Sequence, residues 1–281
     1  MNDFTNPDAL VDTEWLASHL DDPAVAIVEV DEDTTAYTAG HIPGATSLDW
    51  TADLHATPRR DFVNGDELAA LFEKRGIGDD RRIVFYGGNN NWFAAYAYWL
   101  CKHRGIDDVT LLDGGRIKWE LEERPLTTEV TPTSHATMTL GVERPDIRAF
   151  RDEVVALAHG GVTTMIDVRS PAEFTGEVLA PPHLPKEQPY VPGHVPGARN
   201  IPWSQAANED GTFRSAGELA ELYGDAATGA VVAYCRIGER SSHTWFVLSE
   251  LLGNTGAKNY DGSWTEYGSL VGVPVETGAG S

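Results

Sequence analysis

Short apolar runs alternate with longer amphipathic segments along this chain. Residues 26–30 and 82–86 are apolar runs of strand length, rich in β-branched or aromatic side chains. Residues 65–72 and 215–222 instead carry apolar side chains at helical spacing. Because parallel strands need crossover helices, this alternation predicts an α/β fold of three layers, with helices on both faces of a mostly parallel central sheet.

The pattern occurs twice. Four segments recur in the same order: residues 26–30 match 165–168, 41–45 match 194–198, 82–86 match 230–234, and 112–115 match 260–263. Each copy is long enough to form a domain. Residues 125–135 are rich in Thr, Pro and Ser and lack apolar periodicity, as is typical of a linker. We therefore expect one domain at 1–124, a linker at 125–145 and a second domain at 146–281.

The amino-acid composition argues against some classes of binding partner. The 281 residues are 41% hydrophobic, which suffices for a buried core. Acidic residues outnumber basic ones by 43 to 21, giving a net charge of −22. This balance argues against nucleic acid and against an anionic membrane surface as partners. We interpret most of the acidity as a solvated surface, and adaptation to high salt stays open.

Cysteine usage and apolar runs indicate the compartment. The two cysteines, Cys101 and Cys235, are too few for a disulfide framework, which fits a reducing environment. Residues 1–12 have neither a basic start nor an apolar run, and no apolar stretch approaches the length of a membrane span. These features predict a soluble, cytoplasmic protein.

The two copies differ where the second strand of each ends. After Tyr234 the chain reads Cys-Arg-Ile-Gly-Glu-Arg, residues 235–240, whereas after Tyr86 the equivalent position holds Gly87. The carboxyl end of a strand, followed by a helix, is where α/β domains place their sites. Backbone N–H groups and the helix dipole at such a turn favour negative charge.

A thiol at this turn is expected to be reactive. A free cysteine has a pKa of ~8.5, and lowering it by about two units, worth ~2.7 kcal/mol, would ionise most of it at neutral pH. The loop amides with Arg236 and Arg240 would favour the thiolate of Cys235 in this way. A buried, inert cysteine would not require two nearby arginines. Cys101 lies in the apolar segment 95–101 and is expected to pack in the core.

Together, these motifs resemble tandem-domain rhodaneses, which are thiosulfate sulfurtransferases, and the loop is most similar to that of actinobacterial members. The resemblance covers essentially the whole chain and rests on the 235–240 loop, both His-(Ile/Val)-Pro-Gly-Ala segments, residues 167–174 and residues 261–264. In that family the first domain lacks the active-site cysteine and the second carries it. The resemblance thus implies two rhodanese-like domains, of which only the second is catalytic.

The resemblance also implies a mechanism. Cys235 would attack the outer sulfur of thiosulfate, release sulfite and hold a persulfide until cyanide or a thiol accepts the sulfur. Arg240 and Arg236 would stabilise the leaving sulfite, and replacing Arg240 by Ala should lower turnover with little loss of folding. The predicted substrate-binding group, through side chains or loop amides, comprises Arg169, Arg236, Ile237, Gly238, Glu239, Arg240 and Ser241.

Most of the remaining polar residues are expected to have structural roles, and the role of one of them stays open. Asp167 is expected to be a supporting carboxylate that accepts loop amides. Arg169 is expected to bind substrate or to pair with Asp167 or Glu173, and the sequence does not choose between these roles. His41 and His194 are expected to shape turns, since both copies contain them. No spacing indicates a metal site, and no cofactor is expected.

Three other functions have partial support in the sequence. The same fold could use 3-mercaptopyruvate, although the arginines favour a compact dianion. A cysteine phosphatase is disfavoured, because such enzymes have five residues between Cys and Arg and this loop has four. A non-catalytic sulfur-carrier module predicts a missing or blocked thiol, a description that fits only the first copy.

Overall fold

The computed structural model describes residues 3–133, 135–180 and 188–279, which form two compact units. The first unit contains Asp8–Arg144 and Asn208–Phe213, and the second contains Pro145–Ala207, Arg214–Ser281 and the N-terminal segment through Pro7. Residues 125–144, expected to be a linker, thus belong to the first unit by their contacts. His41, for example, pairs with Thr127 through both backbone N–H groups, at 2.9 and 2.8 Å.

The first unit is built on a five-stranded parallel sheet. Its strand order is β1-β5-β4-β2-β3, formed by β1 (Leu10–Val11), β2 (Val25–Asp31), β3 (Thr46–Asp49), β4 (Arg82–Tyr86) and β5 (Val109–Leu112). Its helices are α1 (Thr13–Ser18), α2 (Thr35–Ala39), α3 (Trp50–Leu54), α4 (Gly65–Lys74), α5 (Trp92–His103) and α6 (Gly115–Leu121).

The second unit repeats four of these strands, and within the described residues its sheet has no counterpart of the edge strand β1. Its parallel sheet has the order β7-β6-β8-β9, formed by β6 (Thr164–Asp167), β7 (Arg199–Asn200), β8 (Val231–Tyr234) and β9 (Ala257–Tyr260). Its helices are α7 (Arg151–Ala158), α8 (Pro171–Thr175), α9 (Ala216–Tyr223), α10 (Glu239–Phe246) and α11 (Ser263–Tyr267), and a π-helical turn, Val247–Leu251, continues α10. The predicted duplication is confirmed.

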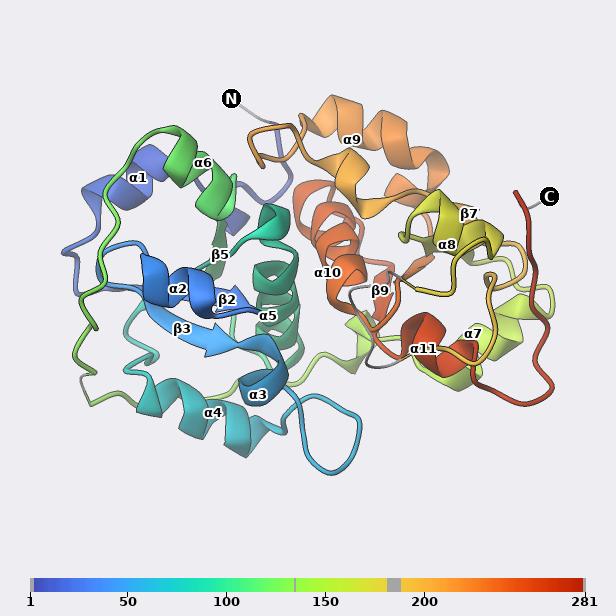
Figure 1. The fold of residues 1–281 in the computed structure, drawn as a ribbon, viewed down its shortest axis with the longest axis horizontal. Helices are drawn as coiled ribbons and strands as arrows, with labels where there is room; N and C mark the ends of the chain where they lie inside the picture. The colour runs from blue at the N-terminus through green and yellow to red at the C-terminus, as the bar shows by residue number, and fades with distance from the viewer. Residues whose placement is uncertain (1–2, 134, 181–187, 280–281) are drawn as a thin grey trace. The chain divides into compact units, whose positions relative to one another are not determined.

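Helices cover both faces of each sheet, as the three-layer prediction requires. On one face of the first sheet, Ile27 and Val84 pack against Leu16 of α1 and Trp119 of α6. Figure 1 shows α1 and α6 on one side of this sheet and α4 on the other. In the second unit, a corresponding cluster joins strand residues such as Val232 to α8 and α11, while α10 contacts β8 and β9.

Local sequence signals set the helix starts. Asn64 before α4 and Ser215 before α9 each accept a backbone N–H from a glutamate three residues later, whose carboxylate bonds back to the cap. These capping boxes satisfy N–H groups that the helix leaves unpaired. The helical interpretation of 65–72 and 215–222 is therefore confirmed.

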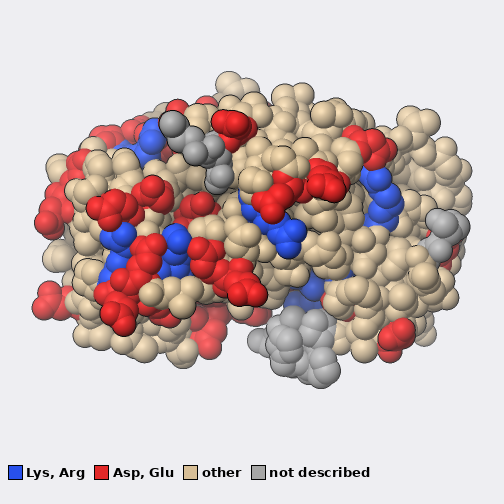
Figure 2. Space-filling view, turned by 90° about the horizontal axis from the view of Figure 1, so that it is seen from above, with Lys and Arg blue, Asp and Glu red and all other residues tan. Residues whose placement is uncertain are grey.

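The surface carries the acidity seen in the composition. Figure 2 shows Asp and Glu side chains spread over much of the visible face, with fewer Lys and Arg among them. Across the described ranges, no helix has the length and apolar character needed to cross a membrane.

Candidate active site

The Cys235 loop joins the carboxyl end of β8 to the start of α10. Gly238 ends the loop with a φ of +101°, a conformation that favours glycine, and a Cβ here would lie 2.7 Å from Asp261. Helix α10 begins directly at Glu239. The loop expected at 235–240 thus ends at Gly238, and Glu239 and Arg240 belong to the first turn of the helix.

Hydrogen bonds converge on the Cys235 sulfur. The Gly238 N–H donates to Sγ at 3.1 Å, and the Ser241 hydroxyl donates to the Gly238 carbonyl at 3.2 Å. The thiol itself lies 3.2 Å from Glu239 Oε2. Behind the cysteine, Ser263 Oγ accepts the Cys235 N–H at 3.0 Å. The side chain is fully buried, so these contacts make up its polar surroundings.

The expected lowering of the Cys235 pKa is wrong for this arrangement. Burial raises the pKa of the thiol, and the Glu239 carboxylate raises it further, while Arg240 and Ser241 act in the opposite direction. Two negative charges at 3.2 Å would repel each other by about 5 kcal/mol at an effective dielectric constant of ~20. Burial and the neighbouring carboxylate therefore favour the thiol form of Cys235.

Arg240 is already paired within the domain. Its Nη1 and Nη2 donate to the two carboxylate oxygens of Glu173 in α8, at 3.0 and 3.1 Å, and its Nε lies 3.6 Å from Glu239 Oε1. Although burial opposes ionisation, Arg240 lowers the pKa of Glu173 below its ordinary value. Two carboxylates thus balance the guanidinium. The expectation that Arg240→Ala would fold nearly normally is not supported, because that variant leaves Glu173 unpaired in a buried site.

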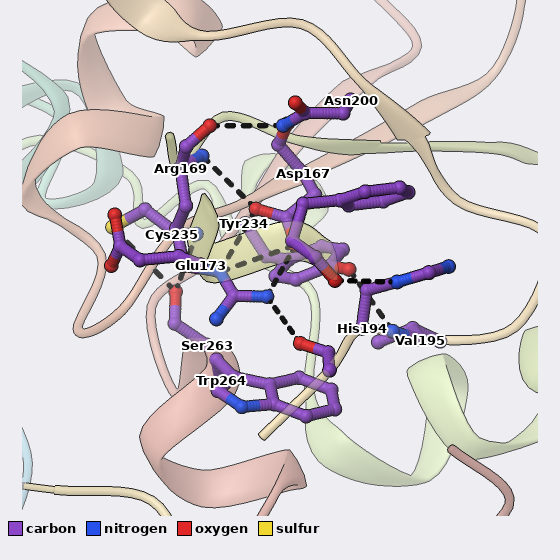
Figure 3. A network of polar contacts seen from close by, with 12 residues as sticks. Asp167, Arg169, Glu173, His194, Val195, Asn200, Tyr234, Cys235, Ser263 and Trp264 are labelled. Atoms are coloured by element: carbon purple, nitrogen blue, oxygen red, sulfur yellow. Dashed lines mark hydrogen bonds and ion pairs between the residues drawn. The ribbon is translucent and has the colours of Figure 1, made fainter. Parts of the chain in front are cut away.

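Asp167 and Arg169 form a separate buried pair. Arg169 Nη2 donates to Asp167 Oδ2 at 2.6 Å and to the Gly193 carbonyl at 2.7 Å. Figure 3 shows its guanidinium between Asp167 and the ring of Trp264, whose centroid is 4.9 Å away. Asp167 Oδ1 also accepts the Arg169 N–H, the contact expected of a supporting carboxylate. Among the roles left open for Arg169, this geometry favours pairing with Asp167 over substrate binding.

The other predicted site residues line the same turn. Arg236 follows the cysteine and is 4% exposed, and its carbonyl accepts the Thr265 N–H at 3.0 Å. Ile237 is also buried. The fold thus brings Cys235, Gly238, Glu239, Arg240 and Ser241 together around one sulfur, while Asp167 and Arg169 form the network beside it.

The histidines have structural surroundings. His41 stacks on Tyr37 and His194 on Phe174, and each ring Nδ1 contacts that partner's carbonyl, at 2.9 and 2.8 Å. This matches their expected role in shaping turns. His243, one turn into α10, is buried, which lowers its pKa to about 3 and keeps it neutral. Within the part of the chain that the structure describes, no group of three His, Cys, Asp or Glu residues could hold a metal ion.

Three features of the site are not predicted by the sequence. Ser263 differs from Gly115 at the equivalent place in the first copy, a signal that the position matters in only one domain. The Glu239 carboxylate follows Cys235 by four residues, yet its contact with sulfur depends on where α10 begins. Arg240 and Glu173 are 67 residues apart in the sequence, so no local pattern predicts that they pair.

The equivalent loop of the first unit is closed by its own side chain. Asn89, Asn90 and Asn91 all have positive φ angles, from 48° to 63°. Asn91 Oδ1 accepts the Gly87 N–H at 3.0 Å, and its Nδ2 donates to the Leu112 carbonyl at 2.6 Å. An amide therefore occupies the turn where the second unit has a thiol and a carboxylate.

Comparisons with known proteins agree with this fold. The chain is 58% identical over 275 residues to a Mycolicibacterium smegmatis protein named "Putative thiosulfate sulfurtransferase", covering 97% of this chain and 99% of that one. It is 49% identical over 281 residues to "Sulfur carrier protein TtuD" of Thermus thermophilus, covering 98% and 99% of the two chains.

Solved structures show the same architecture. The crystal structure of YnjE superposes with a TM-score of 0.84 at 25% identity, covering 98% of this chain and 70% of that one. The wild-type structure of EanB, at 23% identity, superposes with a TM-score of 0.85, covering 99% and 71%. The family model described as "Rhodanese-like domain" matches residues 12–122 and again residues 150–270. With both halves matched, the chain belongs to the family of rhodanese-like domain proteins.

Proposed function

We propose that this protein is a thiosulfate sulfurtransferase that works through a persulfide on Cys235. The names of its relatives support a sulfurtransferase. The second unit has a thiol, Cys235, at the turn where the first unit has Gly87. In this reaction Cys235 Sγ bonds to the outer sulfur of thiosulfate, and the S–S bond of the donor breaks to release sulfite. Cyanide or an acceptor thiol then takes the outer sulfur of the persulfide.

The observation that carries this proposal is the set of donors aimed at one sulfur. The Gly238 N–H at 3.1 Å, together with Ser241 and Arg240, which both act to lower the pKa of the thiol, would stabilise negative charge on Sγ and on a persulfide attached to it. Such preorganised donors act most strongly on charge that develops during the reaction. A reactive free thiol also fits the reducing cytoplasm, where we place the protein.

Intact mass spectrometry tests the proposal. After incubation with thiosulfate, the protein should gain one sulfur atom and lose it again on addition of cyanide. Cys235→Ala should gain none, whereas Cys101→Ala, which removes the other buried thiol, should behave as wild type. Parallel incubation with 3-mercaptopyruvate ranks the two donors. A wild-type protein that takes sulfur only from 3-mercaptopyruvate would contradict thiosulfate as the donor.

The Thermus relative supports a second candidate, a carrier that hands sulfur to another protein. The same Cys235 persulfide would form, but sulfur would leave to a protein thiol rather than to cyanide. The number of turnovers with cyanide distinguishes the carrier from the enzyme. A carrier should accept one sulfur per chain from thiosulfate and release thiocyanate from cyanide only slowly, whereas the proposed enzyme should turn over many times.

A further inference from the structure

An acidic side chain contacts the proposed nucleophile. Glu239 Oε2 lies 3.2 Å from Cys235 Sγ, and both side chains are almost completely buried. An ionised carboxylate only accepts hydrogen bonds, so the contact requires the proton on sulfur or on oxygen. The geometry therefore places one proton between Cys235 Sγ and Glu239 Oε2.

Each member of the pair has its own support for negative charge. The Gly238 N–H donates to the sulfur at 3.1 Å and Ser241 acts to lower the pKa of the thiol, while Arg240 Nε lies 3.6 Å from Glu239 Oε1. Glu239 is also the first residue of α10, where the helix dipole favours an anion. The proton can thus move from sulfur to oxygen without any charge leaving the pair.

Other charged groups near the pair are already matched. Arg240 is balanced by Glu173 from α8, and Asp167 by Arg169. Asp261, which approaches Gly238 from the loop after β9, is bound by Arg148 at 2.8 Å. Arg236 is the second cation of the loop, and His243 is neutral. Among the groups named here, the pair is the place where a proton can readily move.

We propose that Glu239 accepts the proton of Cys235 and delivers it to the leaving group of the sulfur donor. This inference rests on the proposed function. The S–H bond breaks as Glu239 gains an O–H bond, and the Sγ electron pair attacks the outer sulfur. The donor S–S bond breaks with its electrons on sulfite, which takes the proton from Glu239. Cysteine thiol and thiosulfate thus become a persulfide anion and hydrogensulfite, with two negative charges before and after.

This role predicts a preference among donors. Sulfite is a base near neutral pH and gains from a proton donor as it leaves. An arylsulfinate is a much weaker base and gains little. Glu239 therefore suits the site to donors with basic leaving groups. The first unit has Asn91 at this loop position, an amide that cannot exchange a proton in this way.

The test compares two donors in matched variants. Glu239→Gln should slow sulfur gain at Cys235 from thiosulfate at least about tenfold, but from benzenethiosulfonate less than about threefold. Glu239→Asp should recover part of the thiosulfate rate. Glu221→Gln, which removes the same charge from the exposed face of α9, should match wild type with both donors. Equal losses with both donors in Glu239→Gln would overturn the proposal.

Alkylation by iodoacetamide, without any donor, tests the shared proton separately. The pH at which Cys235 becomes reactive should fall in Glu239→Gln, because the thiolate no longer faces a carboxylate. No change in that midpoint would overturn the proton sharing. A wild-type protein that gains no sulfur from either donor would instead overturn the proposed function and, with it, the leaving-group role. The two failures are therefore distinguishable.

Discussion

The two units build the same buried ion-pair network with arginines from different positions in the chain. In the first unit, Arg116 Nη2 donates to both Glu29 oxygens at 2.7 Å and to the Gly40 carbonyl at 2.8 Å. Tyr86 donates to Glu29 and accepts the Ile42 N–H at 3.1 Å. A strand acid, a tyrosine and a guanidinium thus tie β2 and β4 to the turn that follows α2.

The second unit reaches the same arrangement by another route. Arg169 joins Asp167 to the Gly193 carbonyl, and Tyr234 OH accepts the Val195 N–H at 3.1 Å. The guanidinium comes from the residue two places after the strand acid, whereas in the first unit it comes from α6. In both units a guanidinium group bonds the strand acid and the equivalent glycine carbonyl, although the arginine that supplies it stands at a different place in the sequence.

The comparison separates architecture from chemistry. The network occurs in the unit that has no thiol at this turn, so its role is to hold strands and turns together. What differs is the loop after the tyrosine, which presents Cys235 and Glu239 in one unit and Gly87 and Asn91 in the other. The proposed reaction needs only the first of these two sets.

The largest effect on stability should come from removing the arginine of either buried ion-pair network. Arg116→Ala and Arg169→Ala each leave a buried carboxylate uncompensated, and we expect each to lower the free energy of unfolding of its own unit by about 3 to 5 kcal/mol. Urea denaturation, monitored by hydrogen exchange of the amides in each unit, measures the two free energies of unfolding. A small loss for Arg116→Ala beside a large loss for Arg169→Ala would show that the networks are not equivalent.

A smaller loss is expected from Arg240→Ala. Glu173 loses its ion pair but keeps the Ser170 N–H and hydroxyl at 3.1 and 3.0 Å, so we expect a loss of about 3 kcal/mol. Sulfur transfer should also fall at least about tenfold. Arg240→Lys serves as the control, because it keeps the charge and should retain more stability. A folded, fully active Arg240→Ala protein would contradict both parts.

The pH dependence of stability should show a contribution from His243. Its pKa is about 3 in the folded protein against an ordinary 6.5, so below pH 6.5 the unfolded chain binds a proton that the folded chain does not. Stability is therefore lost as pH falls, by ~2 kcal/mol between pH 7 and pH 5. Denaturation of wild type and His243→Gln at both pH values isolates this loss. An identical pH dependence in the variant would refute it.

The smallest effect on activity is expected from placing a thiol in the first unit. A Cβ at Gly87 would lie 2.4 Å from the Val30 carbonyl oxygen, and Asn91 already occupies the turn. Gly87→Cys in a Cys235→Ala background should therefore gain no sulfur from thiosulfate by intact mass. A persulfide on the introduced thiol would show that the loop backbone alone is enough.

The fold and the location of the site were predictable because local patterns encode them. Apolar runs indicated β4 at 82–86, and helical spacing of apolar residues indicated α4 and α9 at about 65–72 and 215–222. The duplicated segments placed Cys235 and Gly87 at equivalent turns. The three-layer parallel architecture followed, because strands separated by helices have few other ways to bury their apolar faces.

The sequence by itself determined which turn holds the thiol and which amides and arginines accompany it. Only the tertiary structure decided the protonation of that thiol, because a pKa depends on burial and on charges that arrive from elsewhere in the chain. Glu173 reaches Arg240 across 67 residues, and the start of α10 turns Glu239 toward the sulfur. The loop that looks strongly cationic in sequence is thereby balanced by carboxylates, and its cysteine keeps the proton.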